Sequence, residues 1–143
     1  MPHKEIKERK SNGMKESKFQ FLNPYLEEVY FIVNPDFNVD NNENIEMKNS
    51  FGVQIKRDEN GNRANVSLEL KTNIEDEKAP FQLQIKVASD FQWEDLDDEQ
   101  VKAMLKLNAP SLLLGYMRPI VASITNSSRM PVYNLPFINF KDS

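Results

Sequence analysis

The sequence contains no cysteine and a single histidine among its 143 residues. The absence of cysteine excludes disulfides, thiolate nucleophiles and thiolate metal ligands. The one histidine, His3, lies in a polar N-terminal stretch, which removes almost every histidine-based mechanism. Neither a glycine-rich phosphate loop nor a Gly-x-Ser-x-Gly motif is present. The sequence therefore predicts a protein that works through its surfaces, with no catalytic residue, no metal and no cofactor.

Long hydrophobic runs are also missing. No apolar stretch approaches the ~20 residues that a membrane-spanning helix needs. The first 18 residues are charged throughout and lack the apolar centre of a secretory signal. With 143 residues, 39% of them apolar, and a net charge of −4, the chain has the size and composition of one ordinary domain. We expect a cytoplasmic protein that does not insert into membranes.

Charge is unevenly distributed along the chain. Residues 1–18 hold six basic and three acidic residues, so residues 19–143 keep 12 of the 18 basic and 19 of the 22 acidic residues, a balance of −7. The N-terminal stretch has too few apolar residues to offset the entropy lost on ordering. We expect a basic flexible arm over residues 1–18 and a single domain over residues 19–143. One short arm on an acidic domain is a poor footprint for nucleic acid, so no nucleic-acid partner is expected.

Alternation of apolar and polar residues predicts strands. The alternating apolar positions are Phe51, Val53 and Ile55, then Val66, Leu68 and Leu70, then Phe81, Leu83, Ile85 and Val87. Such strands are typical of an antiparallel sheet that covers a core on one side. Residues 58–61 predict a tight hairpin with positive φ angles. A further strand is predicted over residues 19–33, where Pro24 favours an edge position or a bulge. We expect the four strands to form a meander.

After residue 91 the hydrophobic period becomes helical. Asp97 and Gln100 form a capping-box variant, and Pro110 suits the first turn of a second helix after an interruption at residues 108–110. Pro119 lies inside that helix and is expected to bend it. The apolar stripe of the helix consists of Leu113, Met117, Ile120, Val121 and Ile124. Strands followed by helices predict an α+β fold, a four-stranded antiparallel sheet with helices packed on one face.

Aromatic residues are abundant, with nine Phe, four Tyr and one Trp. The aromatic, proline-containing segment 130–140 is expected to lie extended against the core. Simple core filling is one explanation of the aromatic residues, and an apolar groove for a flexible partner is the other, since large exposed apolar patches mark interaction sites. The candidate lining residues of such a groove are Phe51, Val53, Ile55, Phe91, Trp93, Leu135, Phe137 and Phe140.

The C-terminal third resembles a known family. Residues 107–120, in which Ala109-Pro110 leads into a bulky run and then Tyr116-Met117-Arg118, resemble the first long helix of the protein-export chaperone SecB. The resemblance continues without a gap through Met130-Pro131, Asn134-Leu135 and Ile138-Asn139-Phe140. Upstream, Phe19-Gln20-Phe21 and residues 25–31 resemble the opening strand of SecB, and Phe81 and Phe91 fall where its fourth strand carries Phe. The resemblance covers roughly residues 19–140.

The resemblance implies an ATP-independent holdase that binds unfolded polypeptides for export and assembles as a homotetramer, a dimer of dimers. The candidate groove would then bind client polypeptides. Two alternatives stay open: a chaperone dedicated to one partner, such as an antitoxin, and an adaptor or binding module on the same scaffold without general chaperone activity. An enzyme is not expected, because no acidic or nucleophilic residue is convincingly placed for one.

The sequence departs from the family pattern at several points. It stops at Lys141-Asp142-Ser143, where the family usually continues into a second helix and an acidic tail. Leu114-Gly115 and Pro119 replace other residue types within the helix. The acidic positions that the resemblance implies for docking of the motor SecA fall on Glu28, Ile32 and Gln84, of which only Glu28 is acidic. We therefore expect weak or absent SecA docking.

Overall fold

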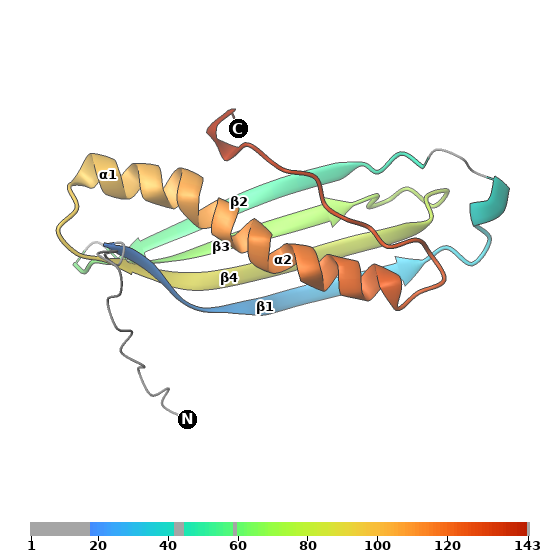
Figure 1. Ribbon diagram of the computed structural model, residues 1–143, viewed down its shortest axis with the longest axis horizontal. Helices are drawn as coiled ribbons and strands as arrows, with labels where there is room; N and C mark the ends of the chain where they lie inside the picture. Colours follow the sequence, from blue (N-terminus) through green and yellow to red (C-terminus); the bar gives the residue numbers. More distant parts are fainter. Residues whose placement is uncertain (1–17, 42–44, 59, 143) are drawn as a thin grey trace, which may run out of the picture.

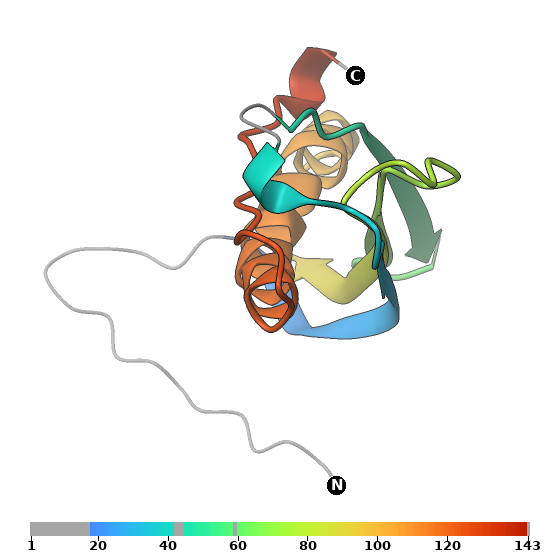
Figure 2. The same cartoon turned by 90° about the vertical axis from the view of Figure 1, so that its right-hand side faces the viewer.

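The computed structural model describes residues 18–41, 45–58 and 60–142, so the predicted basic arm lies outside the described residues except for Lys18. Four antiparallel strands form one sheet in the order β1-β4-β3-β2. The strands are β1 (Phe19–Val33), β2 (Asn49–Asp58), β3 (Arg63–Thr72) and β4 (Phe81–Trp93). A helical run crosses one face of this sheet (Figures 1 and 2), which confirms the predicted α+β architecture.

The strand order is not that of a four-stranded meander. Strands β2, β3 and β4 follow one another, but β1 pairs with β4 rather than with β2, which gives a Greek-key order. Residues 34–48 connect β1 to β2, which lie at opposite edges of the sheet. This connection contains the short 3-10 helix η1 (Val39–Asn41) and is long enough to lead from one edge to the other. Strands β1 and β4 are also the longest, with 15 and 13 residues, so their pairing forms the longest ladder.

Strand β1 lies at an edge of the sheet and is irregular at Pro24, as predicted. The register with β4 shifts between Leu22 and Tyr25, and Asn23 takes a left-handed conformation with φ of 47°. A proline cannot donate to a ladder, and a bulge on an edge strand tolerates this loss. The Ser89 hydroxyl donates to the Leu22 carbonyl at 2.7 Å, so this acceptor is satisfied beside the bulge.

The hairpin between β2 and β3 lies where the sequence predicts it, but its turn is different. Gly61 does not lie in the left-handed region of φ. The Asp58 carboxylate accepts the Asn60 N–H at 3.0 Å, and the Asp58 carbonyl faces the Gly61 N–H at 3.4 Å. Longer hairpin loops are mostly built around ordinary type I turns, which do not need positive φ angles.

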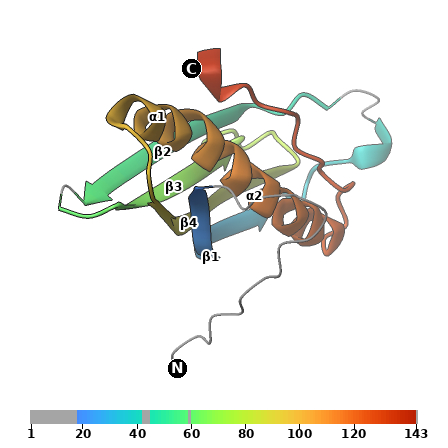
Figure 3. The same cartoon turned by 60° about the vertical axis from the view of Figure 1, so that its left-hand side comes forward.

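The helical run is continuous. It consists of α1 (Asp98–Ala103), the π-helical turn η2 (Met104–Asn108) and α2 (Ala109–Asn126), as Figure 3 shows from the side of α1. The predicted interruption at residues 108–110 therefore does not occur. Pro110 has no N–H to donate to the helical hydrogen bonds. The Ala109 N–H bonds to the Met104 carbonyl, five residues earlier. This wider π turn accommodates the proline ring within a continuous helix.

The helix begins at the predicted cap. The Asp97 carboxylate accepts the Gln100 N–H at 2.8 Å, and the Gln100 side-chain oxygen accepts the Asp97 N–H at 3.0 Å. This capping box satisfies two backbone donors that the first turn would otherwise leave unpaired. It thus fixes where the chain leaves β4 and turns onto the face of the sheet.

The hydrophobic core lies between the sheet and the helical run. The helical side is provided by residues whose side chains are buried against β3 and β4, namely Val101, Leu105, Leu113, Met117 and Val121. After α2 the chain runs back across the same face, and Met130, Leu135 and Phe140 are buried there. The segment 130–140 has no regular secondary structure before the short 3-10 helix η3 (Phe140–Asp142), so it lies extended against the core as predicted.

Candidate functional site

Strand β2 exposes part of its apolar face. Phe51, Val53 and Ile55 pair with Leu70, Leu68 and Val66 of β3, which are fully buried, so both rows lie on the helix-covered face. Yet Val53 is 42% exposed and Ile55 is 36% exposed, while Phe51 is half-buried. The difference arises because β2 is an edge strand, whereas α2 packs over β3, β4 and β1. We call Phe51, Val53 and Ile55 the β2 strip.

Side chains from other elements close both ends of the β2 strip. At one end Phe51 meets Phe140 edge to face, with ring centroids 6.5 Å apart. At the other end the Arg57 guanidinium lies 5.5 Å from the centroid of the Trp93 ring. These contacts leave an apolar stretch of β2 that is bordered by aromatic rings and open to solvent between them.

Arg57 also ties β2 to the start of α1. Its Nη1 lies 2.9 Å from Oδ1 of Asp98, and Lys102 Nζ lies 3.1 Å from Oδ2 of the same carboxylate. Hydrogen bonds from Lys102 and then Arg57 hold the pKa of the Asp98 carboxyl below its ordinary value. The group is fully exposed, so water and salt screen this arrangement strongly.

Four of the eight candidate groove residues belong to the core. Phe91, Trp93, Leu135 and Phe140 are all buried, and Phe91 is fully inaccessible. Phe91 stacks on Phe19 with ring centroids 5.3 Å apart, and Trp93 also stacks on Phe19, with ring centroids 6.1 Å apart. Phe91 and Trp93 lie on β4, on the face that the helical run covers, whereas Leu135 and Phe140 belong to the C-terminal segment and are buried in the same core. For them the core-filling explanation holds.

Phe137 is the opposite case, with 92% of its side chain exposed. Arg118 of α2 lies over its ring at 4.2 Å from the centroid and donates from Nη2 to the Pro136 carbonyl at 2.7 Å. The backbone before Phe137 is therefore attached to the helix while the ring itself projects into solvent.

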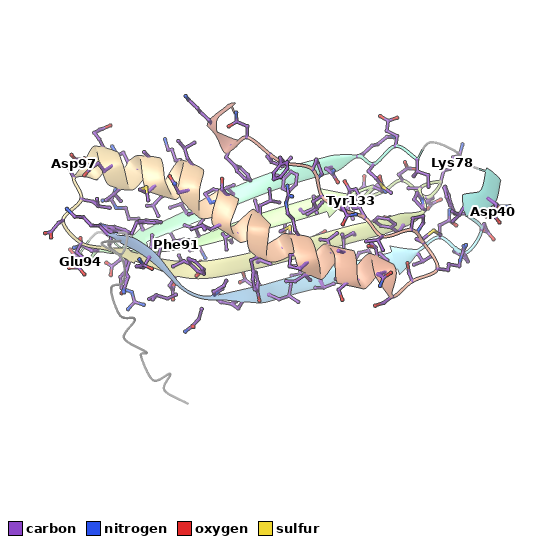
Figure 4. The ribbon with its side chains drawn as sticks, in the orientation of Figure 1. Asp40, Lys78, Phe91, Glu94, Asp97 and Tyr133 are labelled. Atoms are coloured by element: carbon purple, nitrogen blue, oxygen red, sulfur yellow. The ribbon has the colours of Figure 1, made fainter. Side chains whose placement is uncertain are left out.

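A second apolar feature is a pocket of about 210 Å³ toward the end of the sheet opposite α1. Its lining residues are Ile45, Met47, Pro80, Phe81, Met130, Pro131, Val132 and Tyr133. They come from the segment before β2, the start of β4 and the segment after α2, and Figure 4 shows Tyr133 between this last segment and the sheet. A cavity of about 150 Å³ can hold a benzene ring, so this pocket has room for one large apolar side chain.

The sequence reasoning did not find this pocket. Ile45 and Met47 stand in a polar loop, and residues 130–133 follow the last long helix, so no periodic pattern connects them. The only available signal was the presence of apolar residues in otherwise polar loops. The pocket arises because the strand order brings the end of the 34–48 connection beside the C-terminal segment.

Glu28 lies on the face of the sheet opposite the helices. It pairs with Lys86 of β4, which in turn pairs with Glu69 of β3, so one basic residue stands between two acidic residues. The Gln84 side chain donates to Glu28 Oε1 at 2.7 Å. By strand alternation Ile32 shares this face with Glu28 and Gln84. The three positions that the family resemblance implies for SecA docking therefore lie on one face, and only one of them is acidic.

Among residues 18–41, 45–58 and 60–142, no cluster of three or more histidine, cysteine or acidic residues could hold a metal ion. Within the same part of the chain, no helix is both long and apolar enough to span a membrane. The exposed apolar features of the described surface include the β2 strip, the pocket, Phe137 and several side chains of the other edge strand, β1.

A Greek-key sheet covered by a helix on one face, with apolar side chains exposed along both edge strands, defines a class of α+β scaffold. The family described as preprotein translocase subunit SecB matches residues 12–142. The protein-export protein SecB of Anaplasma phagocytophilum (strain HZ) is 34% identical over 132 residues, which are 84% of this chain and 80% of that protein. The chain belongs to the SecB family of protein-export chaperones.

Two further comparisons agree with this assignment. The protein-export protein SecB of Actinobacillus succinogenes is 38% identical over 77 residues, which are 53% of this chain and 45% of that protein. The Rv1957 SecB-like chaperone of Mycobacterium tuberculosis, in complex with a ChAD peptide from the antitoxin HigA1, superposes with a TM-score of 0.69. That alignment covers 85% of this chain and 91% of the other at 15% identity, so it shows a shared fold.

Proposed function

We propose that this SecB-family chaperone is an ATP-independent holdase that binds unfolded polypeptides in the cytoplasm before export. The observation that carries this proposal is the β2 strip, where apolar side chains stay exposed beside a strand with a partner on one side only. An extended client segment could bury its own apolar side chains on the strip and pair its backbone with the open edge of β2.

The chemistry of the apolar surface favours broad selectivity. The pocket is lined by aliphatic, proline, methionine and aromatic side chains, without a charged residue. Flexible methionine side chains adapt to ligands of different shape. Several weak contacts at the strip, the pocket and Phe137 would add up when one client chain occupies them together.

We further propose a homo-oligomer, with a dimer of dimers as the expected form. Strand β1 exposes apolar side chains on both faces, with Phe21, Leu26 and Val29 on the helix-covered side and Tyr25, Tyr30 and Ile32 on the other. An apolar edge strand of this length needs cover from another chain. Light scattering of the pure protein is expected to give at least a dimer, and a monomer at concentrations on the order of tens of micromolar would contradict this.

The decisive experiment measures aggregation of several unrelated unfolded clients, without ATP, in the presence of the chaperone. A holdase is expected to suppress aggregation of most of them at near-equimolar concentration. The second candidate is a chaperone dedicated to one partner, which is favoured by the complex of the Mycobacterium tuberculosis relative with an antitoxin peptide. Protection of one client alone would favour that candidate, and protection of none would contradict both.

A further inference from the structure

Buried polar side chains concentrate around the pocket. In the described part of the chain, the buried polar residues are Ser67, Thr72, Asn73, Ser89 and Thr125. Two of these, Asn73 and Thr125, hydrogen-bond to residues that line the pocket. Thr72 hydrogen-bonds to Asn49, which itself bonds to the pocket residue Tyr133. A buried polar group destabilises a fold unless it is fully hydrogen-bonded, so their clustering beside one apolar pocket suggests a role there.

Thr125 holds one wall of the pocket. It lies in the last turn of α2 and is completely buried. Its Oγ1 donates to the Val121 carbonyl at 2.9 Å and accepts the Tyr133 N–H at 2.8 Å. The wall segment 130–133 has no ladder hydrogen bonds of its own. The hydroxyl of Thr125 thus fixes the position at which this segment returns from the helix to the sheet.

Asn73 holds the opposite wall. Its Oδ1 accepts the Lys48 N–H at 3.0 Å, while its Nδ2 donates to the Phe81 carbonyl at 3.1 Å and lies 3.3 Å from Met47 Sδ. Its backbone takes a left-handed conformation with φ of 56°. One buried amide therefore joins Met47 and Phe81, which both line the pocket.

A third contact links the two walls. The Asn49 amide donates to the Tyr133 hydroxyl at 2.5 Å, and the Thr72 hydroxyl donates to Asn49 Oδ1 at 2.8 Å. Asn49 is the first residue of β2. The loop segments of the pocket wall are thus tied to one another as well as to β3 and α2.

We propose that Thr125 and Asn73 are positioning residues that keep the two pocket walls apart, so that the pocket receives one large apolar side chain of an extended polypeptide. This inference rests on the proposed function, since the side chain would come from a client. Binding is tighter when a site is already ordered before the ligand arrives. Without these bonds the apolar walls could close on each other, since the wall segments 45–48 and 130–133 have no ladder to hold them in place.

The test uses two fluorescein-labelled extended peptides that differ only in a central Phe or Ser. Dissociation constants are measured by fluorescence anisotropy for the wild-type chain and for Thr125→Val, which keeps the shape of threonine and removes the hydroxyl. The wild-type chain is expected to prefer the Phe peptide by roughly tenfold. In Thr125→Val this preference is expected to fall below roughly threefold, and Thr125→Ser, which keeps the hydroxyl, should restore it.

The matched control is Ser89→Ala. Ser89 is also fully buried, but its hydroxyl donates to the Leu22 carbonyl beside β1, away from the pocket lining. This variant should lose stability in urea unfolding and keep the full preference for the Phe peptide. If Ser89→Ala and Thr125→Val lose the preference alike, the effect is general destabilisation and the inference is wrong.

Asn73→Gly is the second variant, because glycine accepts the left-handed conformation of Asn73 and lacks its amide. It is expected to lose the preference as Thr125→Val does, and it decides the question if Thr125→Val does not fold. Full preference in the folded variants would overturn the inference and leave the proposed function intact. A wild-type chain that binds neither peptide would overturn both.

Discussion

Strands β2 and β3 carry the same alternating pattern on the same face of the sheet, yet they differ in exposure. The inward residues of β3 are completely buried between neighbouring strands and α2, while Val53 and Ile55 directly across the ladder remain open to solvent. The two strands have equal length, 10 residues each. What separates them is position, since β3 is central and β2 is at the edge. An apolar row can therefore be core in one strand and exposed to solvent in the next.

The same contrast holds between two aromatic residues. Phe91 is fully buried under the helical run, whereas Phe137 is almost fully exposed beside Arg118. Both were candidates for the groove because aromatic residues look alike in a sequence. The difference shows that residue type predicts a preference for burial, and that the covering element decides whether burial occurs.

The largest expected effect is the difference in stability loss between variants of Phe91 and Phe137. Phe91→Ala is expected to lower the free energy of unfolding by about 3–5 kcal/mol, because it leaves a cavity in a closed core. Phe137→Ala removes the same side chain from the surface and should change the value by less than about 0.5 kcal/mol. Urea unfolding followed by far-UV circular dichroism measures both. Equal losses in the two variants would contradict the assignment of Phe91 to the core and Phe137 to the surface.

The next effect concerns the β2 strip. Val53→Ser combined with Ile55→Ser removes two exposed apolar side chains and is expected to weaken binding of an unfolded polypeptide about tenfold, or ~1.4 kcal/mol. Stability should change little, since both side chains are already partly in water. The matched control is Gln54→Ser with Lys56→Ser, which alters the opposite face of the same strand. Anisotropy of a labelled client measures both, and equal weakening in the control would rule out the strip.

A smaller effect is expected on the opposite face of the sheet. Calorimetry with SecA from the same organism at ~0.15 M salt should detect weak or no binding, because a single acidic residue steers a basic partner poorly. Glu28 also stands across from Lys86, which offsets its charge. Lys86→Glu should strengthen any docking, because it adds a third acidic residue to that row. Sub-micromolar affinity that is lost on Glu28→Lys would contradict this prediction.

The smallest effect is at the bridge between β2 and α1. The pKa of Asp98 lies below its ordinary value because of Lys102 and Arg57, so ionised Asp98 stabilises the fold above roughly pH 4. This contribution is lost as the pH falls through the lowered pKa of the folded state. Asp98→Asn should therefore lower Tm slightly near neutral pH and leave it unchanged in strong acid. A larger difference in acid than at neutral pH would contradict this sign.

Much of the architecture could be predicted from local patterns. The four strands, the capping box at Asp97 and the proline bulge in β1 all depend on residues close together in the chain. Of the eight candidate groove residues, Val53, Ile55 and Phe137 are exposed, and their role in client binding stays a prediction. The hairpin turn and the continuity of the helix were predicted incorrectly, because loop length and a π turn offered alternatives that local residue preferences do not distinguish.

The sequence by itself determined which residues alternate along each strand and which line one side of the helix, because side chains repeat every two residues in a strand and about every 3.6 in a helix. Only the tertiary structure decided that β1 pairs with β4, that β2 stays uncovered and that two distant loops enclose a pocket. These outcomes depend on contacts between segments far apart in the chain. The free energy of such contacts comes from packing one segment against another. The residues of one segment alone do not specify which other segment it packs against.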